Sequence, residues 1–565
     1  MDLLKATKLK CSEDFVPIDV HFRLYAGPGA GKTTFLTKHI KRILEHSTKL
    51  NKSKKIACIT YTNIGVETLK NRLKDASSDV EISTIHSFLY KHVIKPYLWT
   101  LKDCPFRIEL LNGHDEVNLT RSLLKEFKDR SSSYFKEKNN KELSDALKKL
   151  IWHLENESLE LKFLKAYQGK IESHSIKKNS YMIYKEICWE NGFLSHDDVL
   201  FFSYKLLKQN DEINRILRAK FPYMLLDEFQ DTSPLQAEII KIIAQKETIV
   251  GVIGDPCQSI FSFQGTDEML FENFELKNIK NYYLENNHRS TTQIISLLNH
   301  IRSERDFKQS SPSEKQGDAP VILIGNSVAA YKYVSEIKQE FCTLSYKNED
   351  TKSLKFDIES ADEGKVDLRY GDGHRGWMIQ FIVQSIEYAH QMKIKEAIKF
   401  MQLAYHKVNP LTEEEAFINL KRLLDCYEVF SKNNIKDFYN NYIYNYSGVK
   451  TKVSSGGISE FYEQTFYKSI ALNVKIVDDT SLFRTIHKSK GDEFDNVLVI
   501  LNDTNEKNNL KFLLSPDLTN EVHRVYYVAS SRAKENLFIN SPKISNSEMK
   551  KLEKLGIICV TLSDK

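Results

Sequence analysis

The apolar positions along the chain form two kinds of pattern: short runs that end in polar residues, and longer stretches with a helical period. Residues 22–44 predict a buried strand, a glycine-rich turn and an amphipathic helix, and residues 55–63 and 80–88 add two more strand-and-turn units. Two further apolar runs, at residues 221–233 and 247–261, end in polar residues where a strand would meet a loop. The pattern therefore predicts an α/β domain with a parallel sheet.

A second set of strand-like runs follows in the C-terminal half of the chain. These runs lie at residues 319–327, 341–347, 492–501 and 535–542. Each set is interrupted by stretches that have the period of amphipathic helices. Long Lys/Glu-rich stretches such as residues 139–167 interrupt the first set, and the segment from about Trp377 to Lys450 interrupts the second. We therefore expect an α/β fold with two sheets, each interrupted by a mainly helical insertion.

Changes of period give the domain boundaries. The predicted ranges are residues 1–95 and 193–286 for the first α/β domain, 96–192 for its helical insertion, 287–350 and 475–565 for the second α/β domain, and 351–474 for its reduced helical insertion.

Composition narrows the class of protein. With 565 residues, 41% hydrophobic and 28% charged, the chain is expected to be a folded multidomain protein rather than a disordered one. The net charge of +5 is too small to identify a polyanionic partner. The eight cysteines show no CxxC pair, which argues against a zinc site or disulfide framework. No apolar run approaches the roughly 20 residues of a membrane span, so we expect a cytoplasmic protein without a membrane partner.

The turn AGPGAGKTT has the composition of a phosphate-binding loop. Its residues are Ala26, Gly27, Pro28, Gly29, Ala30, Gly31, Lys32, Thr33 and Thr34. Backbone N–H groups and the helix N-terminus would surround a phosphate, with Lys32 near the β- and γ-phosphates and the Thr33 hydroxyl on Mg²⁺. The strict pattern begins with Gly where this chain has Ala26, and a plain glycine turn is the alternative.

A pair of acids supports the phosphate-binding interpretation. Asp227 and Glu228 follow an apolar run in LLDEFQDTS, where Asp227 would hold Mg²⁺ and Glu228 would orient and deprotonate the attacking water. Two adjacent acids at a strand end are usually surface residues. Here they accompany a phosphate loop in the right structural context, so the sequence predicts an ATPase with ATP and Mg²⁺ as cofactors.

Together with the rest of the chain, these residues resemble the UvrD/Rep/PcrA group of superfamily 1 helicases. The motifs that match in order after the phosphate loop are TYTNIGVETLKNRL, STIHSF, LLDEFQDTS, VIGDPCQSIFSFQGT, LENNHRS, TIHKSKGDEF and VYYVASSRAK. The resemblance implies two RecA-like domains, ATP hydrolysis at the cleft between them, and 3′ to 5′ movement on single-stranded DNA or tailed duplex DNA.

The resemblance also implies roles for individual residues. Gln258 becomes the sensor between the γ-phosphate and DNA, and Arg289 and Arg532 become arginine fingers, which stabilise charge on the transferring phosphoryl group. Glu493 matches a ribose-contacting acid, with a surface or capping carboxylate as the alternative, and His288 stands where an aromatic residue commonly stacks on adenine.

Contacts to DNA are implied in the same motifs. Tyr61 and Phe263 match base-stacking positions and Phe261 is a third candidate, although an aromatic residue near a strand end is more often part of the core. The other positions that contact DNA or couple to it are Thr84, His86, Ser87 and His487.

The chain departs from the family in ways that bear on its partners. No Gln precedes Lys32 to read the adenine edge, and Thr34 stands where an Arg often flanks the base. The compact layout is similar to the helicase-like subunit of the Gabija antiphage system, which implies a separate nuclease subunit and the alternative function of a nucleotide- and DNA-sensing regulatory subunit. Asp357, Glu363 and Lys365 only faintly match a nuclease site within this chain, so we do not expect it to cut DNA itself.

Overall fold

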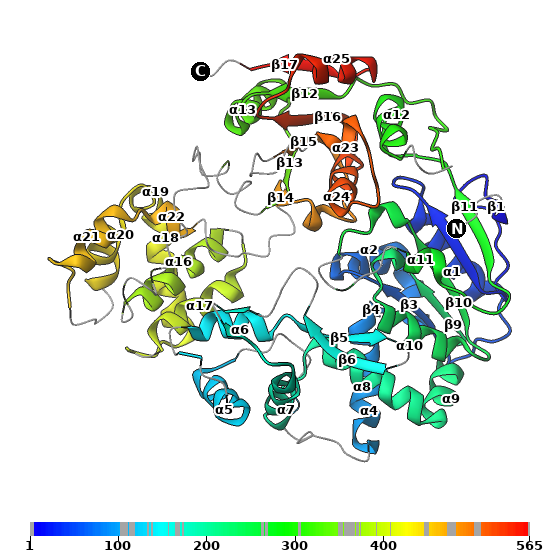
Figure 1. The fold of residues 1–565 in the computed structure, drawn as a ribbon, viewed down its shortest axis with the longest axis horizontal. Helices are drawn as coiled ribbons and strands as arrows, with labels where there is room; N and C mark the ends of the chain where they lie inside the picture. The colour runs from blue at the N-terminus through cyan, green and yellow to red at the C-terminus, as the bar shows by residue number, and fades with distance from the viewer. Residues whose placement is uncertain are drawn as a thin grey trace. The chain divides into compact units, whose positions relative to one another are not determined.

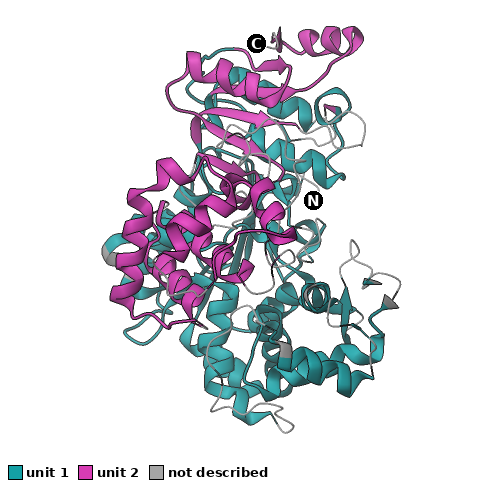
Figure 2. Cartoon of the chain, turned by 90° about the vertical axis from the view of Figure 1, so that its left-hand side faces the viewer, with its two compact units in different colours: residues 1–318, 491–493, 511–535 teal, residues 319–490, 494–510, 536–565 magenta. Residues whose placement is uncertain are grey.

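A computed structural model describes most of the chain, and it forms two compact units (Figure 2). The described residues are 5–101, 111, 119–132, 135–136, 139–155, 158–163, 170–171, 174–261, 265, 269–302, 307–347, 354, 368, 372, 375–390, 392–406, 408–445, 451–471, 482–501 and 510–562. The first unit comprises residues 1–318, 491–493 and 511–535, and the second comprises residues 319–490, 494–510 and 536–565. The four predicted domain ranges stay a prediction.

A seven-stranded sheet organises the first unit (Figure 1). Its strands, in sheet order, are β1 (Thr7–Lys8), β11 (Lys280–Leu284), β2 (Phe22–Ala26), β10 (Ile249–Gly254), β9 (Tyr223–Leu226), β3 (Ile56–Thr60) and β4 (Val80–Thr84). Every neighbouring pair is parallel. The carboxyl ends of these strands therefore meet at one edge, the edge at which α/β proteins bind ligands.

Both faces of this sheet are buried, which explains its continuous apolar strands. In β3, Ile56 and Cys58 belong to the same apolar core as the residues of α1 (Lys32–His46). Ala57 and Ile59 belong to another core, which includes residues of α8 (His196–Gln209) and α10 (Pro234–Ala244). The first predicted α/β arrangement is confirmed.

The remaining elements of the first unit are mostly short helices. They are α2 (Asn63–Leu73), η2 (Lys74–Asp79), α3 (Ile85–Leu89), η3 (Tyr90–Ile94), α4 (Lys95–Tyr97), η4 (Leu98–Thr100), α5 (Arg121–Ser131), α6 (Asn140–Leu147), η7 (Lys178–Ser180), α7 (Tyr181–Glu190), α8 (His196–Gln209), α9 (Asp211–Lys220), η8 (Phe229–Asp231), α10 (Pro234–Ala244), η9 (Pro256–Gln258), α11 (Leu270–Asn273), α12 (Thr292–Ile301), α23 (Lys511–Leu514) and α24 (Glu521–Ser530).

One stretch of the first insertion differs from the sequence prediction. Residues 139–167 were expected to be helical, but after α6 the chain forms an antiparallel hairpin of β5 (Leu150–Glu155) and β6 (Ser158–Phe163). A second small pair, β7 (Lys170–Ile171) and β8 (His174–Ser175), follows. The Trp152 ring stacks on Phe201 of α8 with ring centroids 3.7 Å apart. Leu150 and Trp152, alternate residues of β5, are buried. Because this burial depends on contacts with distant segments such as α8, the local pattern of apolar residues does not predict it.

A six-stranded sheet lies in the second unit. Its order is β14 (Phe483–Thr485), β13 (Cys342–Ser345), β15 (Phe494–Ile500), β16 (Ala533–Ser541), β12 (Val321–Ile324) and β17 (Ile558–Thr561). β13 pairs in parallel with β14 and β15, and β12 pairs in parallel with β16 and β17. Helices α13 (Ser327–Ile337), η12 (His487–Ser489) and α25 (Asn546–Lys554) connect these strands. The second predicted α/β arrangement is confirmed, and the fold is that of two RecA-like domains.

A helical region with its own apolar core completes the second unit. Its elements are α16 (Gly376–His390), α17 (Ile394–Tyr405), α18 (Glu413–Asp425), α19 (Tyr427–Phe430), α20 (Ile435–Phe438), η11 (Tyr439–Tyr444), α21 (Gly457–Gln464) and α22 (Tyr467–Ala471). The helical pattern predicted from about Trp377 to Lys450 is thus confirmed in the described part of that stretch. Asp357, Glu363 and Lys365 lie outside the described residues. Among the helices that are described, none is both long and apolar enough to cross a bilayer.

Candidate nucleotide-binding site

The phosphate loop joins β2 to α1 at the carboxyl edge of the seven-stranded sheet. Gly29 and Gly31 have φ angles of 68° and 84°, the left-handed region that glycine tolerates best. A Cβ atom on Gly29 would lie 2.3 Å from Asn287 Oδ1, and one on Gly27 would lie 2.7 Å from the Gln309 side chain. The glycines therefore allow other segments of the same unit to approach the loop closely.

The first residues of α1 occupy the positions that the sequence predicted. Lys32 begins the helix, and its Nζ donates a hydrogen bond of 3.3 Å to the carbonyl oxygen of Ala26. Thr33 follows, and its carbonyl oxygen accepts a hydrogen bond of 2.6 Å from the Thr37 hydroxyl. The ammonium group thus reaches back over the loop, where a phosphate would meet it.

The acid pair follows β9 directly. The Asp227 amide donates to the carbonyl oxygen of Ile59 at 2.9 Å, which ties this turn to β3. Glu228 has a φ of 52°, an uncommon backbone conformation for a residue with a side chain and one that clusters at functional sites. Its carboxylate accepts a hydrogen bond from Gln230 Nε2. A network within the protein therefore orients Glu228.

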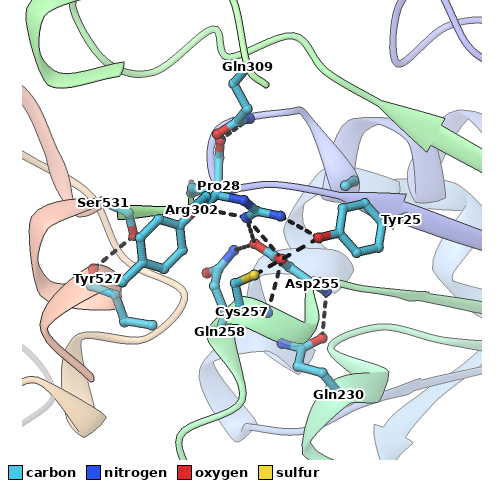
Figure 3. Close-up of polar contacts among 12 residues, drawn as sticks. Tyr25, Pro28, Gln230, Asp255, Cys257, Gln258, Arg302, Gln309, Tyr527 and Ser531 are labelled. Atoms are coloured by element: carbon cyan, nitrogen blue, oxygen red, sulfur yellow. Dashed lines mark hydrogen bonds and ion pairs between the residues drawn. The ribbon is translucent and has the colours of Figure 1, made fainter. Parts of the chain in front are cut away.

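Gln258 and Arg532 meet although they are 274 positions apart in the sequence. Gln258 is buried, its Nε2 donates to Asp255 Oδ2 at 2.8 Å, and its Oε1 accepts from Arg532 Nη2 at 2.9 Å. Arg532 also donates to the carbonyl oxygens of Val528 at 3.1 Å and Asp492 at 3.2 Å. Figure 3 shows Gln258 beside Asp255. The structure thus brings together two residues that the sequence assigned to one site.

The second predicted arginine finger lies in the same unit. Arg289 Nε donates to Glu493 Oε2 at 2.8 Å, and Arg289 Nη1 donates to the carbonyl oxygen of Ser531 at 3.0 Å. Burial disfavours the charged form of Glu493, but the charge and hydrogen bond of Arg289 outweigh it and lower the pKa of this carboxyl. Glu493 therefore holds Arg289 in the structure, a role additional to the predicted ribose contact.

The electrostatics of this cluster fit a nucleotide with its Mg²⁺. Burial, and then the positive charge of Arg289, lower the pKa of Arg532 to about 9, while Glu228 acts in the opposite direction. The two guanidinium groups repel each other, so a bound anion would stabilise their charged forms. Thr33 and Asp227 carry the oxygen atoms that Mg²⁺ prefers. The residues present therefore fit the triphosphate and Mg²⁺ expected from the sequence.

His288 and Thr34 are the residues expected beside the base of the nucleotide. The backbone amide of His288 donates to the carbonyl oxygen of Gly29 at 2.9 Å, and its side chain is exposed. The Thr34 hydroxyl accepts a hydrogen bond of 3.5 Å from Arg72 on α2. Sequence reasoning noted the missing arginine after Thr33 but did not identify Arg72, because the two positions are 38 residues apart.

Two of the predicted base-stacking residues contact each other. The rings of Tyr61 and Phe261 are stacked, with centroids 4.9 Å apart and planes inclined by 28°. Phe261 is only 7% exposed, which agrees with its alternative role in the core, whereas Tyr61 is half-buried. Burial raises the pKa of Tyr61, so its hydroxyl stays neutral. Phe263 lies outside the described residues.

The other predicted DNA contacts have local roles as well. The Thr84 hydroxyl caps α3 by accepting from the Ser87 amide at 3.3 Å, and it donates to the Ser87 hydroxyl at 3.0 Å. The His86 ring packs against His196, with centroids 5.1 Å apart. His487 is in the second unit, where its ring packs nearly perpendicular to that of Tyr346, with centroids 5.6 Å apart. DNA contact by these residues stays a prediction.

Two family profiles match the chain. Residues 15–279 match the UvrD/REP helicase N-terminal domain, and residues 334–543 match the UvrD-like helicase C-terminal domain. Together the two matches include every segment from which the site is built except the stretch around Arg289.

Individual relatives agree with these profiles. The chain is 27% identical to a probable DNA helicase II homolog of Mycoplasma capricolum over 432 residues, which are 72% of this chain and 56% of that protein. It is 23% identical to the Gabija protein GajB of Bacillus cereus over 673 aligned positions, 93% of this chain and 94% of that protein. The chain thus spans little more than half the length of the first relative. The matched profiles and the assembled phosphate site place this chain in the UvrD/Rep-type DNA helicase family.

Proposed function

We propose that this protein is an ATP-dependent translocase that moves 3′ to 5′ along single-stranded DNA and separates the strands of a suitable tailed duplex. The observation that carries the proposal is the assembly of Gln258, Arg289 and Arg532 with Glu228 in one compact unit. The polarity follows from the resemblance to the UvrD-type branch, not from any distance in the structure.

Each phosphate-site residue has a distinct task in this proposal. Bound ATP with Mg²⁺ supplies the phosphoryl group whose transfer to water releases the free energy for movement. Lys32 neutralises phosphate charge, Thr33 and Asp227 hold the metal, and Glu228 accepts a proton from the attacking water. Arg289 and Arg532 stabilise the charge that spreads over the transferring group.

Gln258 gives the nucleotide site a route to the aromatic pair. It contacts Arg532 through its amide oxygen, and Phe261, three residues further along the same segment, stacks on Tyr61. A change at the phosphate that moves Gln258 therefore acts on the segment that presents these rings. Stacking of a base on an aromatic residue contributes about 1–3 kcal/mol, enough for this link to change the hold on DNA.

A second candidate is a regulatory subunit that senses nucleotide and DNA for a separate nuclease without processive unwinding. The match to the Gabija protein GajB, which extends over 94% of that protein, favours this candidate. The absence of any Gln before Lys32 adds to it, because nucleotide selectivity then rests on other residues. Both candidates require ATP hydrolysis, and they differ in what the hydrolysis drives.

One set of measurements tests the proposal. ATP hydrolysis by the purified chain is measured with and without single-stranded DNA, with several nucleotides, and strand separation is measured on duplexes with a 3′ or a 5′ tail. We expect DNA to stimulate hydrolysis, Lys32→Ala and Glu228→Gln to abolish it, and only the 3′-tailed duplex to be unwound. Hydrolysis that ignores DNA would overturn the translocase. Hydrolysis and DNA binding without unwinding, restored by a co-purifying nuclease, would support the regulatory subunit instead.

A further inference from the structure

A fully buried ion pair lies next to Gln258. Arg302 follows α12, Asp255 follows β10, and neither side chain has any exposed surface. Arg302 Nη1 lies 3.1 Å from Asp255 Oδ1 and 3.0 Å from Asp255 Oδ2. None of the phosphoryl-transfer roles proposed above uses Arg302. Because two charges lose their hydration on burial, such a pair requires good geometry and further hydrogen bonds to persist.

Contacts from several segments fix the position of the Arg302 guanidinium (Figure 3). Nη1 donates to the Tyr527 hydroxyl of α24 at 2.7 Å, and Nη2 donates to the Tyr25 hydroxyl of β2. The guanidinium carbon lies 4.6 Å from the centroid of the Phe307 ring. Asp255 therefore faces a charge that cannot easily move away from it.

Asp255 in turn determines how the Gln258 amide is oriented. Its Oδ2 accepts from Gln258 Nε2 at 2.8 Å, and its Oδ1 accepts from the Cys257 amide at 3.2 Å. An ionised carboxylate only accepts hydrogen bonds, so the NH₂ group of Gln258 must face it. The amide oxygen of Gln258 consequently points to Arg532, whose Nη2 donates to it at 2.9 Å.

The same aspartate is linked to the proposed general base. The Asp255 amide donates to Gln230 Oε1 at 3.0 Å, and Gln230 Nε2 donates to the Glu228 carboxylate. Hydrogen bonds therefore lead from the Arg302–Asp255 pair to Glu228 on one side and to Arg532 on the other. Buried hydrogen-bond networks of this kind hold catalytic groups in place.

We propose that Arg302 is a positioning residue for ATP hydrolysis, which acts through Asp255 to keep the Gln258 oxygen on Arg532 and thereby sets this arginine for the γ-phosphate. The inference rests on the proposed function. Lys32 Nζ donates to the carbonyl oxygen of Ala26, whereas Arg302 meets β2 only at the Tyr25 hydroxyl among the contacts given above. We therefore expect loss of Arg302 to lower the rate of hydrolysis and to leave nucleotide affinity largely unchanged.

The principal test compares Arg302→Met with a matched control, Arg218→Met. Arg218 is also buried, but it donates to the carbonyl oxygens of Ile242 at 2.9 Å and Ile243 at 3.1 Å. With saturating single-stranded DNA, we expect Arg302→Met to lower kcat by about 10- to 100-fold, the cost of misplacing a catalytic group, and to change KM for ATP by less than about threefold. Arg218→Met should lower Tm and leave kcat within about twofold of the wild type.

Further variants keep the inference falsifiable if Arg302→Met folds poorly. Arg302→Lys retains the charge and should recover at least about fivefold of the lost kcat. Asp255→Asn with Arg302→Met removes both charges, so Tm should recover, but an amide both donates and accepts and no longer fixes Gln258. Because both residues act through one link, the double variant should lose about as much kcat as Asp255→Asn alone.

The outcomes separate the inference from the function it rests on. A kcat for Arg302→Met that matches Arg218→Met, or losses from Arg302 and Asp255 that multiply in the double variant, would overturn the role of Arg302 while the ATPase stands. A wild-type chain that hydrolyses no ATP with single-stranded DNA would overturn the proposed function, and the positioning role with it.

Discussion

The phosphate side and the DNA side of the candidate site differ in how their predicted residues are used. On the phosphate side, Gln258 and Arg532 bond each other, and Glu228 is bonded through Gln230. On the DNA side, Thr84 caps a helix and Tyr61 stacks on Phe261. Buried polar groups require partners inside the protein, and on the phosphate side Gln258 and Arg532 are each other's partners. Tyr61 and Thr84 are only half-buried, so each can stabilise the local fold and also contact a ligand. The two sides should therefore respond separately to substitution.

The largest expected effect is on the phosphate side. Glu228→Gln removes the proposed general base, so kcat should fall by about 10²–10⁴-fold while the affinity for single-stranded DNA stays unchanged. ATP hydrolysis and fluorescence anisotropy of labelled DNA measure the two quantities. Glu247→Gln, at an exposed glutamate, is the matched control and should change neither. A parallel loss of DNA affinity in Glu228→Gln would show that the two sides are not separable.

Tyr61→Ala tests the DNA side in the opposite way. Loss of one stacking ring, worth about 1–3 kcal/mol, should weaken single-stranded DNA binding by about 5- to 150-fold and leave kcat at saturating DNA near the wild-type value. Titration of the ATPase with DNA gives both numbers. Tyr61→Phe keeps the ring and should bind DNA normally; if it binds as weakly as Tyr61→Ala, the hydroxyl and not the ring makes the contact.

A smaller effect is expected at Thr84, where capping and DNA contact can be distinguished. Thr84→Ala removes the cap of α3 and should lower the free energy of unfolding by about 1 kcal/mol, and Thr84→Ser should restore it. Denaturant unfolding and DNA titration are measured on both variants. Weaker DNA binding by Thr84→Ala without a loss of stability would assign the hydroxyl to DNA rather than to the helix.

The last prediction concerns stability alone, at a carboxyl at the start of α8, beside the His196 that packs on His86. Burial chiefly raises the pKa of Asp197 from 3.8 to about 7, with a contribution from Asp198 in the same direction, against the opposing charge of Lys185. The folded state therefore binds an extra proton between these values. Its stabilising effect is complete below pH 3.8, decreases across this window and is lost above about pH 7.

Asp197→Asn keeps an acceptor for the Trp152 amide and removes this titration. We expect the melting temperature of the variant to exceed that of the wild type by more at pH 8 than at pH 5. Thermal melting across this pH range measures the difference. An identical shift at both pH values would mean that the carboxyl does not titrate in this window.

The sequence by itself determined the order of strands and helices around the phosphate loop and the identity of its residues. Apolar runs that end in Asp227 or Asp255, and glycines that permit the tight loop before Lys32, are local signals of backbone geometry. The resemblance between ordered motifs then assigned Arg289 and Arg532 to the phosphate, and the structure places them with Glu228 in one unit.

Only the tertiary structure decided which residues are partners. Arg302 and Asp255 are 47 positions apart, and nothing in the sequence around Arg302 distinguishes a buried guanidinium from a surface one. The hairpin of β5 and β6 is decided in the same way, because the contact of Trp152 with Phe201 overrides a pattern that also suits a helix. Periodicity and turn chemistry act over a few residues, whereas burial and ion pairing depend on segments that meet only after the chain has folded.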